Sequence, residues 1–315
     1  MNNPVVSALL PVVLLIAIGF VAGRAGWIRA QATKDLSNLV FMVLTPALLF
    51  RTMSTVHVQE LNFKPVLMYF VASALLFGLM LVWQGATRRA TVLALAATFS
   101  NTVMIGVPLI GLAYGQAGLI ILFTLVSVHA LVLLVLATLV LELAVARELA
   151  ASASAGRQHM WLTMLAAVRG SIIHPVPLPI IVGLAFAQTG LLIPAVLDRP
   201  LQLLGNAFGP MALVLVGVTL AFVRVGDHLK GAIGLSLIKN LAFPALVAVL
   251  SWSMGLVGLP LKVMIVTASL PIGANVFMFS QRYEVAEELV TASMSVSTLL
   301  ALATVSLVML LLAGV

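Results

Sequence analysis

The sequence predicts an all-α integral membrane protein with ten transmembrane helices. Of its 315 residues, 63% are hydrophobic and 8% are charged, whereas a soluble domain has about 25% charged residues. Apolar stretches of about 20 residues, the length that crosses the hydrocarbon core, recur along the chain. Two of them are interrupted near mid-span, at residues 101–108 and 270–275. No polar linker divides the chain, so we expect one membrane domain.

The predicted spans follow one another with short connections. They are 5–23, 36–56, 65–84, 91–113, 117–146, 162–188, 200–223, 231–255, 260–281 and 286–313. Arg169, His174 and three prolines crowd the first half of the sixth span, so we expect its membrane segment to start near His174. No Lys or Arg precedes the first span, which favours an uncleaved helix over a signal peptide.

Basic residues in the connections predict the orientation. Eleven Lys and Arg residues lie in the odd-numbered connections and four in the even-numbered ones. Because cytoplasmic loops are enriched in Lys and Arg, the odd-numbered connections face the cytoplasm. We therefore expect a multi-pass membrane protein with both termini outside.

The two halves of the chain have related patterns. Five spans per half is an odd number, so a second half built like the first enters the membrane upside down. We expect a first repeat at 1–146, a short cytoplasmic loop at 147–160 and a second repeat at 161–315. The matching sequences SVHAL at 127–131 and SVSTL at 295–299 support this, because the same offset aligns the two interrupted spans.

The interruptions indicate a binding site. Proline removes a backbone donor from a helix, and the freed groups are tolerated in lipid only inside protein or beside a wet cavity. Ordinary kinks are the alternative, but paired breaks in matching halves favour a site. Helix termini there would attract an anion, and two asparagines would add neutral amide donors. The candidate substrate-binding residues are Asn101, Gly106, Pro108, Pro271, Gly273 and Asn275.

Other polar or kinking residues within spans are further candidates. Lys239 lies about eight residues, roughly 12 Å, inside the eighth span. It could act in charge balance or coupling, or it could snorkel to the interface. His129 could relay protons or bond to a neighbouring helix. Four residues could form a site wall or hinge, or only pack between helices: Asn38, Thr45, Pro46 and Pro210.

Several function classes lack support. There is no cysteine, so disulfides and thiolate metal sites are excluded. No metalloprotease, hydrolase or phosphate-loop motif occurs, so we expect no enzyme activity, no cofactor, no metal and no direct use of ATP. The net charge of +7 is spread singly through short loops, which favours membrane orientation over nucleic-acid binding.

The residues at three places resemble the auxin efflux carrier family, which includes plant PIN proteins and bacterial organic-acid permeases. These are 38–50 (NLVFMVLTPALLF), 100–108 (SNTVMIGVP) and 270–275 (LPIGAN). The resemblance implies two inverted five-helix repeats, with broken helices four and nine crossing at the substrate site. It also implies a homodimer with an elevator-like mechanism, in which helices one, two, six and seven form the scaffold. The chain lacks the long central loop of many plant members, which favours a bacterial carrier of small carboxylates.

The main hypothesis is a secondary active transporter of a small organic anion, such as a malonate-like or malate-like carboxylate or an auxin-like acid, by alternating access. One alternative is a membrane sensor that binds the same ligand without net transport. Another is a sodium-coupled carrier like the related bile-acid symporters, and a passive channel is a third. The residues leave open which anion is moved, whether protons or sodium are coupled, and whether transport is import or export.

Overall fold

The computed structural model describes residues 4–57, 59, 61–151, 175–223 and 226–314. Within these ranges every regular element is a helix, and β pairing is limited to one isolated bridge. Six helices in the described part are long and apolar enough to cross a membrane. The molecule is therefore all-α and built as a membrane protein, as the sequence predicts. The ten-span inverted arrangement stays a prediction.

Helices occupy the described part of every predicted span. The first half contains α1 (Pro4–Arg24), α2 (Ala32–Leu39), η1 (Val40–Leu44), α3 (Thr45–Met53), α4 (Phe63–Gln84), α5 (Arg88–Thr98), η3 (Thr102–Gly106) and α6 (Val107–Ala151). The second half contains α8 (Pro177–Ala187), α9 (Ala195–Phe222), η4 (Gly226–His228), α10 (Leu229–Leu237), η5 (Ile238–Ala242), α11 (Phe243–Ser253), α12 (Gly258–Ser269), α13 (Asn275–Arg282) and α14 (Glu287–Leu312). Residues 162–174 of the predicted sixth span lie outside the described residues.

Local sequence sets several helix boundaries. The side chains of Asn62 and Thr87 accept hydrogen bonds from backbone N–H groups at the starts of α4 and α5, at 3.0 and 3.1 Å. Such caps satisfy donors that have no partner inside the helix. Gly115, with a φ of 60°, makes the turn inside α6 that separates the fourth predicted span from the fifth. Glycine adopts this left-handed conformation without the steric cost that other residues incur.

Three short π-helices of the described chain, η1, η3 and η5, each end two residues before a proline. The prolines are Pro46, Pro108 and Pro244. Proline cannot donate to the carbonyl four residues back and its ring clashes with it. A wider π turn takes up this mismatch, so the helix continues past the proline instead of breaking. At η1 the Thr45 hydroxyl also donates to the Val40 carbonyl, at 2.7 Å.

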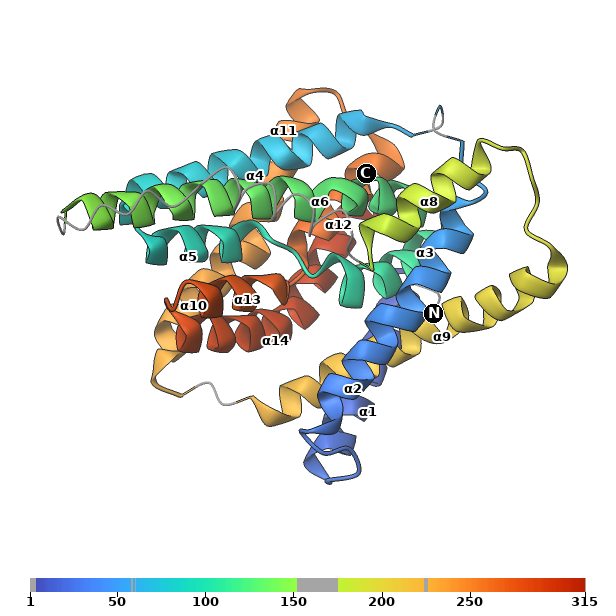
Figure 1. Cartoon of the computed structure of the whole chain (residues 1–315), viewed down its shortest axis with the longest axis horizontal. Helices are drawn as coiled ribbons and strands as arrows, with labels where there is room; N and C mark the ends of the chain where they lie inside the picture. Colours follow the sequence, from blue (N-terminus) through green and yellow to red (C-terminus); the bar gives the residue numbers. More distant parts are fainter. Residues whose placement is uncertain (1–3, 58, 60, 152–174, 224–225, 315) are drawn as a thin grey trace.

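The helices pack in two groups (Figure 1). One group contains α1, α2, α3, α8 and α9, and the other contains α4, α5, α6 and α10 to α14. The first group consists of the spans that the family resemblance assigns to a scaffold. Its central pair, α1 and α9, packs with backbones in contact: a Cβ atom on Gly217 would lie 1.9 Å from the Ile16 carbonyl oxygen. Small residues allow this close approach in membrane helices.

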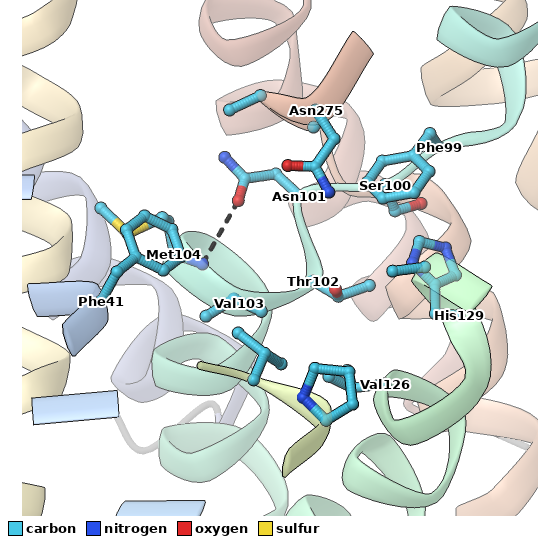
Figure 2. Close-up of a pocket in the computed structure, with 15 residues that line it drawn as sticks. Phe41, Phe99, Ser100, Asn101, Thr102, Val103, Met104, Val126, His129 and Asn275 are labelled. Carbon is cyan, nitrogen blue, oxygen red and sulfur yellow. Dashed lines mark hydrogen bonds between the residues drawn. The ribbon is translucent and has the colours of Figure 1, made fainter. Parts of the chain in front are cut away.

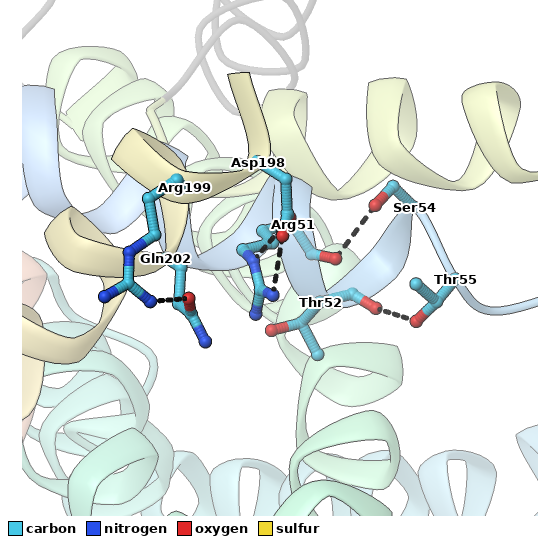
Figure 3. Close-up of polar contacts among 7 residues, drawn as sticks. All are labelled: Arg51, Thr52, Ser54, Thr55, Asp198, Arg199 and Gln202. Carbon is cyan, nitrogen blue, oxygen red and sulfur yellow. Dashed lines mark hydrogen bonds and ion pairs between the residues drawn. The ribbon is translucent and has the colours of Figure 1, made fainter. Parts of the chain in front are cut away.

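An ion pair also joins two helices of the first group (Figure 3). The Arg51 guanidinium at the end of α3 donates two hydrogen bonds to the Asp198 carboxylate at the start of α9, at 2.7 and 3.1 Å. Both side chains are about one-third exposed, at 36% and 35%. Because solvent screens such a pair, it contributes little to stability. The pair connects the C-terminal end of α3 to the first turn of α9.

Candidate functional site

The two interrupted spans meet at their breaks. Phe99, Ser100 and Asn101 separate α5 from η3, and residues 270–274 separate α12 from α13. Ser100 and Ile272 form an antiparallel bridge. The Asn101 N–H donates to the Pro271 carbonyl at 2.8 Å, and the Gly273 N–H donates to the Phe99 carbonyl at 2.9 Å. Each break therefore satisfies backbone groups that the other leaves free.

The first break lies slightly upstream of the predicted 101–108 interruption. The chain is helical again from Thr102, and Gly106 and Pro108 lie inside helical segments. The physical reason is the π-helix η3, which lets the helix pass Pro108 without a second break. Only Asn101 of the predicted residues in this half therefore belongs to the non-helical crossing.

The oxygen and the nitrogen of the Asn101 side chain differ in their hydrogen bonding (Figure 2). Its Oδ1 atom accepts a hydrogen bond from the Met104 N–H at 3.2 Å, as a cap for η3. In the described part of the chain, its amide NH₂ group donates to no protein atom. Asn275 is the first residue of α13, and its side chain also makes no hydrogen bond among the described residues. Two amide groups are thus available at one place.

A small pocket of about 70 Å³ lies at the crossing and is lined by Asn101, Gly273 and Asn275, together with His129 and Phe41. Asn101 and Phe41 also line an adjoining cavity of about 350 Å³. That volume is in the range of small-molecule sites. The larger cavity extends past four hydroxyl groups to the chain connections at one end of the bundle. These hydroxyls belong to Ser37, Thr219, Ser295 and Thr298.

The walls of both cavities are largely apolar, and their described lining contains no Lys, Arg, Asp or Glu side chain. Neutral amides, hydroxyls, backbone groups and the His129 imidazole are the polar partners that a ligand meets. The N–H groups of Ala274 and Asn275, at the start of α13, donate no hydrogen bond among the described residues. Their position at a helix N-terminus favours a negatively charged ligand group.

The remaining predicted binding residues support the crossing through packing. Pro271 is buried and accepts the Asn101 N–H. A Cβ atom on Gly273 would lie 2.7 Å from the Phe99 ring, and one on Gly106 would lie 2.8 Å from the Leu270 side chain. The absence of a side chain at both glycines lets the two spans approach. Pro108 faces Gly209 of α9, in the other helix group.

His129 lies beside the first break. It is 2% exposed and lines the small pocket, with its ring centroid 4.5 Å from that of Phe99. Its Nε2 atom is 3.4 Å from the Tyr69 hydroxyl, which lies 2.9 Å from the Ser100 hydroxyl. The structure thus joins His129 to the break through Tyr69. This places the histidine at the site and leaves its predicted role in coupling untested.

Lys239 lies beside the second break. Its side chain is fully buried, so it does not snorkel to the interface. The ammonium donates to the carbonyl oxygens of Ala268 and Leu270, each at 2.6 Å. These carbonyls belong to the C-terminal end of α12, where the second break begins.

The predicted wall or hinge residues lie elsewhere. Asn38 and Pro210 are exposed, and Thr45 bonds to its own helix. Neither cavity at the crossing is lined by these residues or by Pro46. Ser37 and Phe41, from the same predicted span as Asn38, line the larger cavity instead.

Sequence reasoning missed four polar residues at the crossing. They are Tyr69, Ser100, Asn240 and Ser297. The Asn240 amide donates to the Ser297 carbonyl at 2.8 Å, and the Ser297 hydroxyl accepts the Ile272 N–H at 3.1 Å. Asn240 is an amide within an otherwise apolar span, which is a signal that could have found it, whereas the hydroxyls of the other three give no such signal. Ser297 also occupies the position that matches His129 in the paired 127–131 and 295–299 sequences.

Sequence comparison identifies the class of protein. The profile of the membrane transport protein family matches residues 4–309. The chain therefore belongs to this family, the auxin efflux carrier family that its three motifs resemble. It is a multi-pass membrane protein of a transporter family, which favours transport over catalysis.

Two curated relatives align over almost their whole length. The chain is 27% identical over 310 residues to a protein of Rhizobium meliloti (strain 1021) named "Putative malonate transporter", covering 96% of this chain and 94% of the relative. It is 23% identical over 349 residues to "Auxin efflux carrier component 8" of Arabidopsis thaliana, covering 95% of each. Both names describe transport proteins.

Proposed function

We propose that the protein is a secondary active transporter of a small organic anion with a carboxylate group. The observation that carries this proposal is the crossing of two broken spans, where Asn101 and Asn275 present free amide groups to an apolar-walled cavity. Membership of a transporter family and the name of the Rhizobium relative support it. A malonate-like or malate-like carboxylate is the substrate class we favour.

The binding chemistry follows from the available donors. The carboxylate accepts hydrogen bonds from the amide groups of Asn101 and Asn275 and from the free N–H groups at the start of α13. A charge bound to neutral donors at a helix terminus needs no cationic side chain in the walls. The apolar walls then surround the carbon skeleton of the substrate.

The proposed architecture is two inverted repeats, 1–146 and 161–315, in a bacterial inner membrane with both termini outside. The helix group of α4 to α6 and α10 to α14 carries the crossing and moves against the group of α1, α9 and their neighbours, as in an elevator. Two copies of the chain associate through the latter group. The cavity of about 350 Å³ is lined by Thr33, Val223 and Thr291, which lie near the ends of α2, α9 and α14 beside connections that contain Lys or Arg. We therefore propose that this cavity is open to the cytoplasm.

Replacement of the asparagines by aspartate tests the site. In Asn101→Asp the new carboxylate keeps an oxygen to cap η3, and in Asn275→Asp a carboxylate at the start of α13 suits a helix N-terminus. Both changes remove the amide donors and add repulsion. We expect each variant to reduce saturable malonate uptake into liposomes by at least about tenfold, or ~1.4 kcal/mol, with little loss of thermal stability.

Asn62→Asp is a matched control, because Asn62 caps α4 with its side chain but lies far along the chain from either break. It should transport at the wild-type rate. Wild-type uptake by both Asn101→Asp and Asn275→Asp would remove the crossing from the substrate path. Ligand-dependent thermal stabilisation without flux would identify a sensor, and flux that does not saturate would identify a channel.

A further inference from the structure

Lys239 connects the eighth predicted span to the second break in an unusual way. It lies in the π-helix η5 and is fully buried. Two of its three ammonium N–H groups donate to Ala268 and Leu270 carbonyls at 2.6 Å. These distances are at the short end for N–H···O hydrogen bonds. Lys239 is therefore held firmly at the end of α12.

The two carbonyls are of the kind that bind cations in carriers with broken helices. The last carbonyls of a helix lack intrahelical partners and form the negative end of its dipole. In such carriers, half-helix C-termini and unwound carbonyls coordinate a coupling sodium ion or proton. Here the ammonium of Lys239 already occupies this position.

The surroundings of the ammonium are also those of a cation site. The Phe243 ring centroid lies 5.1 Å from Nζ, which gives an additional electrostatic attraction. Among the described ion pairs, none involves Lys239. Among the described residues, the contacts of Nζ are therefore two carbonyl oxygens and a ring, and no carboxylate forms an ion pair with it.

We propose that Lys239 is a built-in replacement for a coupling cation. It stabilises the carbonyls of α12 in every state of the transport cycle and keeps a positive charge behind the anion site, so the carrier needs no sodium. This inference rests on the proposed transport function. The π-helix η5 contributes directly, because it aims Lys239 at α12 while Asn240 bonds to Ser297.

The test compares wild type with Lys239→Ala and Lys239→Met in liposomes, in buffers of sodium, potassium, methylammonium or the bulky cation N-methylglucamine. Wild-type malonate flux should be the same with each cation. Lys239→Ala should lose about tenfold or more in N-methylglucamine, or ~1.4 kcal/mol, and regain flux with sodium or methylammonium, which fit the space left. Lys239→Met fills that space with an apolar chain, so no cation should rescue it.

Lys230→Ala is the matched control, because Lys230 is an exposed lysine on α10, in the same apolar helical segment, Leu229–Ser253. It should transport like wild type in every buffer. A wild-type flux that requires sodium would overturn the inference. The inference would also fail if Lys239→Ala showed wild-type flux in N-methylglucamine. It would fail as well if Lys239→Ala lost flux and neither sodium nor methylammonium restored it.

Thermal unfolding in detergent gives a readout that does not depend on transport. Sodium or methylammonium should raise the melting temperature of Lys239→Ala and leave those of wild type and Lys239→Met unchanged. If wild type shows no saturable flux, the proposed function fails, and this measurement still decides whether Lys239 fills a cation site. If Lys239→Ala folds only with an added small cation, the inference is supported, and failure to fold with every cation counts against it.

Discussion

At the scale of single residues, Gly273 lies where two stretches of backbone come closest. A Cβ atom there would lie 2.7 Å from the Phe99 ring and 3.0 Å from the Ser100 carbonyl oxygen. The same Gly273 donates its N–H to Phe99. The position thus combines close packing with one of the two hydrogen bonds that join the breaks.

We expect Gly273→Ala to destabilise the protein by about 1–3 kcal/mol, as overpacking does in a core, and to reduce flux by displacing the breaks. Thermal unfolding in detergent and malonate uptake measure the two effects. Gly78→Ala in α4 is the control, because nothing lies within 4 Å of its added methyl group. A Gly273→Ala protein with wild-type stability and uptake would contradict the close approach.

The sequence singled out those site residues whose type is unusual within an apolar span. Asn101, Asn275 and Lys239 stand out because an amide or ammonium is costly within an apolar span. Tyr69 and Ser297 do not stand out, because hydroxyls are common between membrane helices and bond to their own backbone as often as to a ligand. Only the packing of separate spans shows that both reach the crossing.

At the scale of elements, the apolar stretches predicted where helices lie, because length and hydropathy alone decide which segments span lipid. The positions of prolines predicted helix interruptions less well than hydropathy predicted the helices. Pro108 and Pro210 both lie inside continuous helices. Hydrogen bonding in a π-helix at Pro108 accommodates the missing donor, and this local solution depends on neighbouring turns that a sequence pattern does not specify.

The contact between α1 and α9 gives a prediction at this scale. A methyl group on Gly217 would clash with the Ile16 carbonyl oxygen at 1.9 Å, and backbone cannot move aside as a side chain can. We expect Gly217→Ala to cost at least the ~1–3 kcal/mol typical of overpacking, measured as a lower melting temperature in detergent.

Gly234→Ala in α10 is the matched control, since its added methyl group would have no neighbour within 4 Å. It should melt at the wild-type temperature or above. If Gly217→Ala and Gly234→Ala melt together, the α1–α9 contact is looser than these distances require.

At the scale of the whole molecule, two cavities lie at opposite ends of the bundle. The cavity of about 350 Å³ reaches the crossing and includes Thr219. Another of about 580 Å³ is lined by Arg51, Thr55 and Asp198 and contains no residue of either break. Only the first therefore leads to the proposed binding site.

The chain has no cysteine, so single cysteines report access without a background. We expect a membrane-impermeant maleimide to label Thr219→Cys from the cytoplasmic side and Thr55→Cys from the periplasmic side. Both positions are exposed. Labelling of each from the opposite side would reverse the orientation predicted from basic residues, and labelling of both from one side would rule out the predicted topology between these spans.

The paired hydrogen bonds between the breaks limit how the protein can move. To separate them would leave donors and acceptors unsatisfied in a region without bulk water, at a cost of several kcal/mol for each group. In the elevator movement that we propose, α5, η3, α12 and α13 therefore travel together as one rigid unit. The substrate would keep the same contacts throughout its passage, and only the surroundings of the unit would change from one side of the membrane to the other.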